Sequence, residues 1–164
     1  MGHLRLTLRP QILLVPIVIL TAMRPGDASW VNDEPILMEM AIRYNHTASA
    51  IYGFSLPFTP CPYGPQSIHG VRYGPLSIWI DQLFLVFTRN LVVMLAVRAM
   101  LLSSLTAAAL IWLAKTLRLS PWFALVTMLS PWIWLFSRDL WDSTWCIPVS
   151  ALLLAAYSRF LNNG

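Results

Sequence analysis

The chain has 164 residues, of which 57% are hydrophobic and only 11% are charged. Soluble domains carry about 25% charged residues, and a domain of this length has too much surface to bury so many apolar side chains. The composition therefore argues against an ordinary soluble domain and predicts an integral membrane protein. The net charge of +4 comes from scattered cations without a basic run, so it predicts a membrane-topology signal and not a nucleic-acid partner.

The first apolar segment covers residues 10–23 and follows two cations, Arg5 and Arg9. A bilayer-spanning helix needs about 20 residues, so this segment is short, and its basic flank also fits a signal peptide. We favour a first transmembrane helix and leave a cleaved signal open. In either case the residues after Met23 are expected on the extracytoplasmic side.

A large extracytoplasmic loop is expected over residues 24–89, because the stretch "LPFTPCPYGPQSIHGVRYGP" is too rich in Pro and Gly for one regular element. Proline suits the first turn of a helix, and Pro35 opens "PILMEMAIRY". There Ile36, Met40 and Tyr44 recur every four residues. An amphipathic helix over 35–45, lying at the membrane interface, is therefore predicted.

A second interfacial helix is predicted over 76–88, because this apolar segment is short and contains Asp81. Three further transmembrane helices are predicted at residues 90–114, 121–136 and 146–160, with an extracytoplasmic loop at 137–145. The fold class is thus an all-α polytopic membrane protein with about four transmembrane helices and a single membrane domain over 1–164.

Charge supports the topology in which the 76–88 helix does not cross the bilayer. Every acid then lies outside or at the outer boundary, as the positive-inside rule favours. The cytoplasmic side holds only cations: Arg5, Arg9, Lys115, Arg118 and Arg159. If the 76–88 helix did cross, the acidic stretch "SRDLWDST" would fall on the inner side instead.

Two acidic clusters and one buried cation form the candidate site. Asp33 and Glu34 are the first cluster; Asp139 and Asp142, with Arg138, are the second. Arg98 lies about two turns inside an apolar helix, where a cation needs a carboxylate or a phosphate as partner. Structural alternatives stay open: Asp33 as a helix cap, Arg138 and Asp139 as a solvated pair, and Arg98 reaching the headgroups.

The order of these motifs resembles the start of a GT-C-type membrane glycosyltransferase. The motifs are "NDEP", "GPLSIW", "VRAMLLSSL" and "SRDLWDST". The similarity is to the protein O-mannosyltransferase and aminoarabinose transferase group, including dolichyl-phosphate-mannose-protein mannosyltransferase-like proteins. The chain departs from that pattern at Gly74, where Pro is usual, and at Asn90, where an acid is frequent. Because family members have eight or more spans, the chain is expected to be the N-terminal part of such a fold, a truncated form or a reduced relative, and the isolated chain is expected to be short of full activity.

The resemblance implies transfer of a sugar from a polyprenyl-phosphate-linked donor to an extracytoplasmic acceptor with inversion. Asp33 would be the base, with Glu34 supporting it. Arg98 and Arg138 would bind the donor phosphate, since Arg matches phosphate geometry. Asp142 or Asp139 would orient the acceptor or a metal ion, and the need for a divalent cation stays open.

The partners implied are membrane lipid, the lipid-linked donor, and a protein, lipid or glycan acceptor, at the outer face of a bacterial plasma membrane or in the ER membrane. The competing class is a non-enzymatic assembly subunit or a transporter fragment. The sequence gives no Cys/His spacing typical of zinc. Cys61 and Cys146 are either a disulfide or two thiols, and Asn45 begins a glycosylation sequon.

Overall fold

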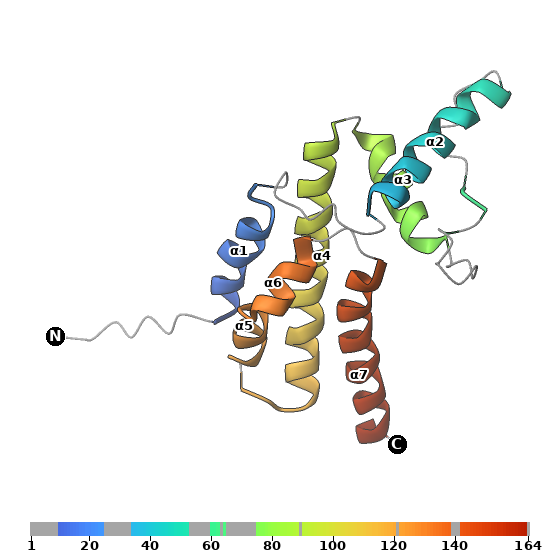
Figure 1. Ribbon diagram of the computed structural model, residues 1–164. Coiled ribbons are helices and arrows are strands. Elements are labelled where there is room, and N and C mark those ends of the chain that lie inside the picture. Colours follow the sequence, from blue (N-terminus) through green and yellow to red (C-terminus); the bar gives the residue numbers. More distant parts are fainter. Residues whose placement is uncertain are drawn as a thin grey trace. The chain divides into compact units, whose positions relative to one another are not determined.

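The computed structural model describes residues 10–24, 34–52, 60–62, 64, 75–88, 90–120, 122–138 and 142–163. Within these ranges the chain is all-helical and has no strand, which confirms the predicted all-α class. Figure 1 shows the helices in chain order. The chain divides into two compact units. Unit 1 comprises residues 1–23, 99–138 and 143–164, and unit 2 comprises residues 24–98 and 139–142.

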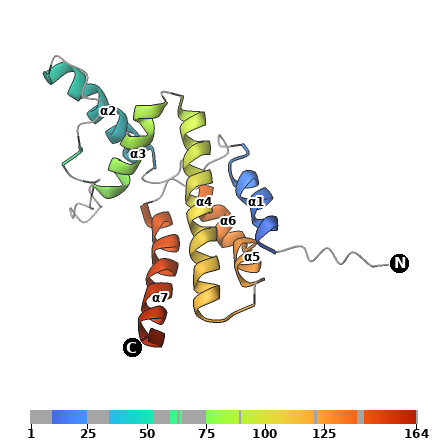
Figure 2. The ribbon, with the colours of Figure 1, turned by 180° about the vertical axis from the view of Figure 1, so that it is seen from behind.

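Among its described residues, unit 1 contains four complete α-helices and the longer part of a fifth. The four are α1 (Pro10–Thr21), α5 (Phe123–Met128), α6 (Pro131–Arg138) and α7 (Cys146–Asn163). The fifth is α4 (Leu91–Thr116), whose residues from Ala99 onward belong to this unit. Side chains of α1, α4, α5 and α7 share one hydrophobic cluster, and both ribbon views show α7 running beside α4 (Figures 1 and 2). The short 3-10 helix η2 (Asp142–Trp145) leads into α7.

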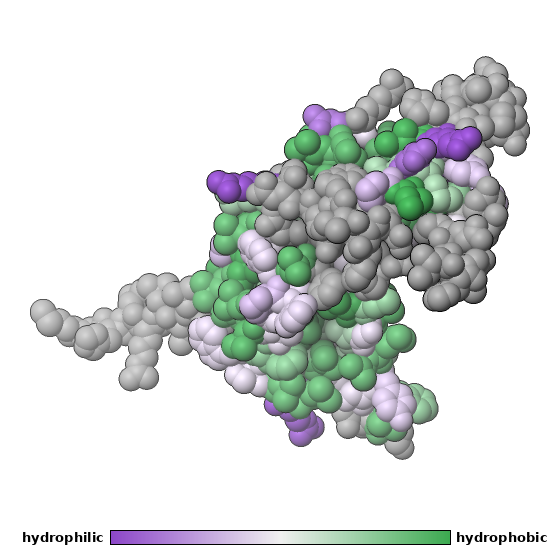
Figure 3. All heavy atoms as spheres, in the orientation of Figure 1, coloured by the Kyte–Doolittle hydropathy of each residue, from purple (hydrophilic) through white to green (hydrophobic). Residues whose placement is uncertain are grey.

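The packing of α7 places small residues inside and large residues outside. Ala151 and Ala155, one turn apart, are buried. The leucines between them face outward, with Leu153 65% and Leu154 57% exposed. Small residues at helix contacts let backbones approach closely, and a row of large apolar residues on the outside is typical of contact with lipid or with a partner. Hydrophobic side chains accordingly cover much of the visible face over these helices (Figure 3).

Enlarging Ala155 to Leu is therefore expected to destabilise unit 1 by about 1–3 kcal/mol, because the added atoms overpack a fully buried position. The matched control is Leu153→Ala on the exposed face of the same helix, for which a change within about 0.5 kcal/mol is expected in detergent. Thermal unfolding of both variants in micelles measures the difference. Equal effects of the two substitutions would show that α7 packs by another face.

The segment predicted as one helix over 121–136 is two short helices in the structure. Helix α5 ends at Met128 and α6 begins at Pro131. Pro131 has no amide hydrogen, so it cannot donate to the carbonyl of Thr127 as the next turn of an α-helix requires. That carbonyl instead accepts a hydrogen bond from the Ser130 amide at 3.0 Å. The helix is therefore interrupted between Met128 and Pro131.

Unit 2 is built on the contact between α2 (Glu34–Tyr52) and α3 (Leu76–Phe87), with the first two turns of α4. Helix α2 is longer than the predicted 35–45, whereas α3 matches the predicted 76–88 to within one residue. The buried face of α2 is formed by Leu37, Met38 and Ala41. The spacing of Ile36, Met40 and Tyr44 predicted an amphipathic helix at the membrane interface, and these side chains are half-buried or exposed. Leu37 and Ala41, one residue further along, are buried because they pack with Ile78 of α3.

Helix α4 is the one helix in the described ranges that is long and apolar enough to cross a membrane. Its 26 residues give a length of about 39 Å at a rise of 1.5 Å per residue, against a hydrocarbon core of about 30 Å. Three other apolar helical stretches are shorter: Ile12–Thr21, Leu76–Phe87 and Cys146–Leu161. Length and composition therefore indicate a membrane association through α4.

Candidate functional site

The structure describes few of the predicted site residues. Asp33 and Asp139 lie outside the described residues. Glu34, Arg138 and Asp142 lie in helices α2, α6 and η2, but their side chains also fall outside the description. The predicted roles of the two acidic clusters therefore stay predictions. Arg98 is the one predicted site residue whose side chain is described.

Helix α2 begins at Glu34, directly after Asp33 in the sequence, and Pro35 occupies its first turn. This agrees with the expected helix start at the "NDEP" motif, because Pro fits the first turn, where the amide hydrogen has no partner. Glu34 is thus the first residue of α2. The partial positive charge of a helix N-terminus stabilises anionic side chains.

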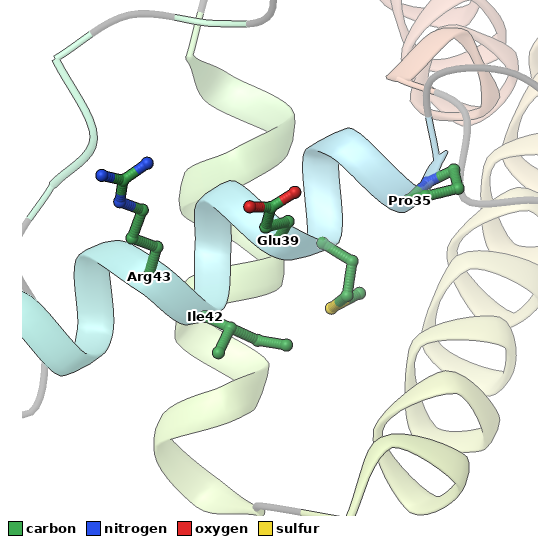
Figure 4. Close-up of a pocket in the computed structure, with 5 residues that line it drawn as sticks. Pro35, Glu39, Ile42 and Arg43 are labelled. Carbon is green, nitrogen blue, oxygen red and sulfur yellow. The ribbon is translucent and has the colours of Figure 1, made fainter.

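An open groove of about 440 Å³ runs along α2 from this N-terminal end. Among the described residues its lining comes from Pro35, Met38, Glu39, Ile42 and Arg43. Figure 4 shows the Glu39 carboxylate and the Arg43 guanidinium on one side of the helix, with Ile42 turned away from them. The groove therefore combines apolar and charged groups within three turns of the acid pair. Such a lining suits a ligand with an apolar and a polar part.

Arg98 forms an ion pair with Asp81 inside unit 2. The Arg98 Nε donates to Asp81 Oδ1 at 3.0 Å, and the two side chains are 2% and 0% exposed. The sequence left open whether a carboxylate, a phosphate or the headgroup region meets this cation. The structure shows a carboxylate from α3. Because a buried charge without a partner is unstable, the pair ties α3 to the first turns of α4.

Burial raises the pKa of Asp81 from its ordinary 3.8 to about 6, while the Arg98 charge and hydrogen bond oppose that rise. Its second oxygen, Oδ2, has no hydrogen-bond partner among the described residues. Loss of hydration therefore outweighs the attraction of one guanidinium. The carboxyl is able to take up a proton near pH 6, well above the usual range for aspartate.

The stability of unit 2 is accordingly expected to fall as pH rises from 4 to 7. The folded state binds the Asp81 proton more tightly than the unfolded chain, so this contribution is fully present below pH 3.8 and is lost as pH rises through about 6. Unfolding in detergent across this range, compared with the double variant Asp81→Leu/Arg98→Met, isolates the effect. Identical pH slopes in the two proteins would contradict it.

A polar cluster lies beside the ion pair and is centred on Gln82, which is fully buried. Its Nε2 donates to Asn45 Oδ1 at 3.0 Å, and its Oε1 accepts from the Cys61 amide at 3.2 Å. Trp79 Nε1 donates to the Cys61 carbonyl at 2.7 Å. The Asn45 amide also donates to the Gln82 carbonyl at 3.2 Å. The cluster therefore holds α2, α3 and the segment at Cys61 together.

The structural roles of Asp81 and Gln82 were not predicted from the sequence. The available signal was their position: both interrupt an apolar helix in a chain with few charges, and an isolated buried acid requires a cation. Asn45, noted as a sequon, has its amide engaged with Gln82. Cys61 and Cys146 are thiols in the structure, the first buried and the second exposed.

The arrangement contains no cluster of three or more His, Cys, Asp or Glu side chains suited to a metal ion within the described residues. Compared with known proteins, the chain matches no protein-family model, no curated protein and no solved structure. The functional interpretation therefore depends on the chain's own motifs and on the geometry of unit 2.

Proposed function

We propose that this chain is the N-terminal membrane portion of a GT-C-type glycosyltransferase, which moves a sugar from a polyprenyl-phosphate-linked donor to an extracytoplasmic acceptor with inversion. The observation that carries the proposal is the α2 groove, which begins at Pro35, one residue after Glu34 and two after Asp33. Such chemistry requires a base within hydrogen-bond reach of the acceptor, so a groove that begins next to the acid pair in the sequence supports the proposal.

The proposal includes four membrane passes: α1, α4, the broken α5–α6 pair, and α7. Helices α2 and α3 would lie at the outer interface. Three features support it: the length of α4, the outward-facing leucines of α7, and the large exposed apolar side chains of α1, including Ile12, Val15 and Ile19. A broken helix is tolerated at membrane depth when other protein segments cover its free backbone groups.

The chemistry proposed needs a base at the acceptor and cations at the leaving phosphate. Asp33 would remove the proton of the acceptor hydroxyl or amine as the new glycosidic bond forms, and the donor's bond to phosphate would break. Because Arg98 is engaged with Asp81 and is only 2% exposed, Arg138 is the better candidate for the phosphate. Glu34 would support the base, and Asp139 or Asp142 would orient the acceptor.

A second candidate function is a non-enzymatic membrane assembly subunit. One observation favours it: the Asp81–Arg98 pair accounts for the buried cation without any ligand. In this alternative the outward-facing apolar side chains of α7 would contact a partner as well as lipid.

Membranes from cells that produce the protein provide the test. Polyprenyl-phosphate-linked sugars are supplied as donors, and transfer to endogenous acceptors is measured against membranes that lack the protein. The proposal expects donor-dependent transfer that requires the protein. Absence of transfer with every donor, together with co-purification of a stoichiometric membrane partner, would favour the assembly subunit.

A further inference from the structure

A second pocket, of about 730 Å³, lies in unit 1 between the C-terminal ends of α4 and α7. It contains three cations, Lys115 and Arg118 from the end of α4 and Arg159 from α7. Its remaining lining residues are Trp112, Thr116, Leu117 and Ser158. None of the described lining residues is acidic. The Thr116 hydroxyl donates to the Trp112 carbonyl at 2.9 Å. The pocket therefore combines three positive charges with the Ser158 hydroxyl, which can act as a hydrogen-bond donor to an anion.

The backbone at the end of α4 holds Arg118 in an unusual conformation. Its φ is 55°, in the left-handed region that favours glycine. The Leu119 amide donates to the Ala114 carbonyl at 2.8 Å, and the Arg118 amide to the Lys115 carbonyl at 3.3 Å. This is a Schellman helix end, in which glycine is the usual residue at the position of Arg118.

An arginine at this position is therefore unfavourable for the backbone. A non-glycine residue in the left-handed region costs on the order of 1 kcal/mol. A cation at the C-terminal end of a helix complements the helix dipole, which offsets part of this cost. The guanidinium also joins Lys115 and Arg159 in lining the pocket.

We propose that this pocket binds a phosphate group, presented by an anionic phospholipid headgroup or as free inorganic phosphate. Guanidinium groups bind phosphate oxygens through paired hydrogen bonds, and basic pockets between the ends of membrane helices bind anionic headgroups. Trp112 belongs to the residue type enriched at membrane–water interfaces. This inference does not depend on the glycosyltransferase proposal, because it applies equally to an assembly subunit.

The position of Arg118 allows binding and folding to be separated. Arg118→Gly removes one cation and places glycine where the backbone favours it, so the fold is expected to be retained or stabilised. Arg24→Gly is a matched control. Arg24 also has a positive φ, 51°, follows the end of α1, and does not line the pocket. Both variants lose one arginine and relieve the same type of backbone conformation.

The full chain is purified in detergent and titrated with phosphatidylglycerol, phosphatidylcholine or inorganic phosphate, with binding followed by native mass spectrometry and by thermal shift. We expect Arg118→Gly to weaken phosphatidylglycerol binding about five-fold, the effect of one cation near an anionic bilayer, and Arg24→Gly to leave it unchanged. Competition by inorganic phosphate would identify free phosphate as a ligand of the same pocket. Equal binding by the wild type and Arg118→Gly, or equal losses in both variants, would overturn the proposal.

Discussion

Replacing Asp81 with Leu is expected to lower the free energy of unfolding by about 3–5 kcal/mol. The substitution leaves the Arg98 guanidinium buried without its carboxylate, and a buried charge that loses its partner is destabilising by this amount. Denaturant unfolding in detergent, followed by tryptophan fluorescence, measures the loss. Trp79 lies two residues before Asp81 in α3 and reports on this region.

The double variant separates the stabilising effect of the Asp81–Arg98 interaction from the effect of each side chain alone. Arg98→Met alone is expected to cost less than Asp81→Leu, because the remaining carboxyl can take a proton and become neutral. Asp81→Leu/Arg98→Met together are expected to recover most of the stability, since well-packed apolar residues replace buried ion pairs at little cost. Glu39→Leu, at an exposed carboxylate of α2, is the control. Additive losses in the double variant would show that the two side chains do not stabilise each other.

Replacing Asp33 with Asn is expected to reduce sugar transfer by about 10²–10⁴-fold, the usual contribution of a general base. Stability is expected to change by no more than about 1 kcal/mol, because Asn caps a helix about as well as Asp. The two readouts therefore distinguish a base from a cap. Donor-dependent transfer and thermal unfolding are measured on the same membranes.

Asp27→Asn is the matched control for that experiment, because Asp27 precedes the acid pair by six residues in the sequence and has no role in the proposed reaction. Its transfer rate is expected to equal that of the wild type. Undiminished transfer by Asp33→Asn would remove Asp33 from the reaction. A similar fall in both variants would indicate a general effect of loop charge instead of one base.

The helical elements could be predicted because composition and spacing determine them locally. Long apolar runs predicted the bounds of α4 and α7 to within a few residues, and Pro35 predicted the start of α2. The break at Pro131 was also visible in principle, since proline lacks the donor that a continuous helix needs. The prediction of one helix over 121–136 gave apolar length more weight than this missing hydrogen bond.

The partner of Arg98 was harder to predict, because it depends on tertiary contacts. Asp81 lies 17 residues before Arg98 on a different helix. No local sequence rule predicts which residues of two helices face each other. The sequence showed that a cation in an apolar helix needs an anion. It could not choose between a protein carboxylate and a lipid phosphate, because both satisfy the same charge. The burial of Leu37 and Ala41 has the same origin, since contact with α3 decides which side chains of α2 are covered.

Membrane topology is the claim on which the proposed site depends most directly. Single cysteines at positions 39, 119 and 143, in a background with Cys61 and Cys146 replaced by Ser, are tested in intact cells with a membrane-impermeant maleimide. The account predicts that positions 39 and 143 react from outside, and that position 119 reacts only after permeabilisation. Reaction at position 119 from outside, with position 143 protected, would mean that α3 crosses the bilayer and that the two acidic clusters lie on opposite sides.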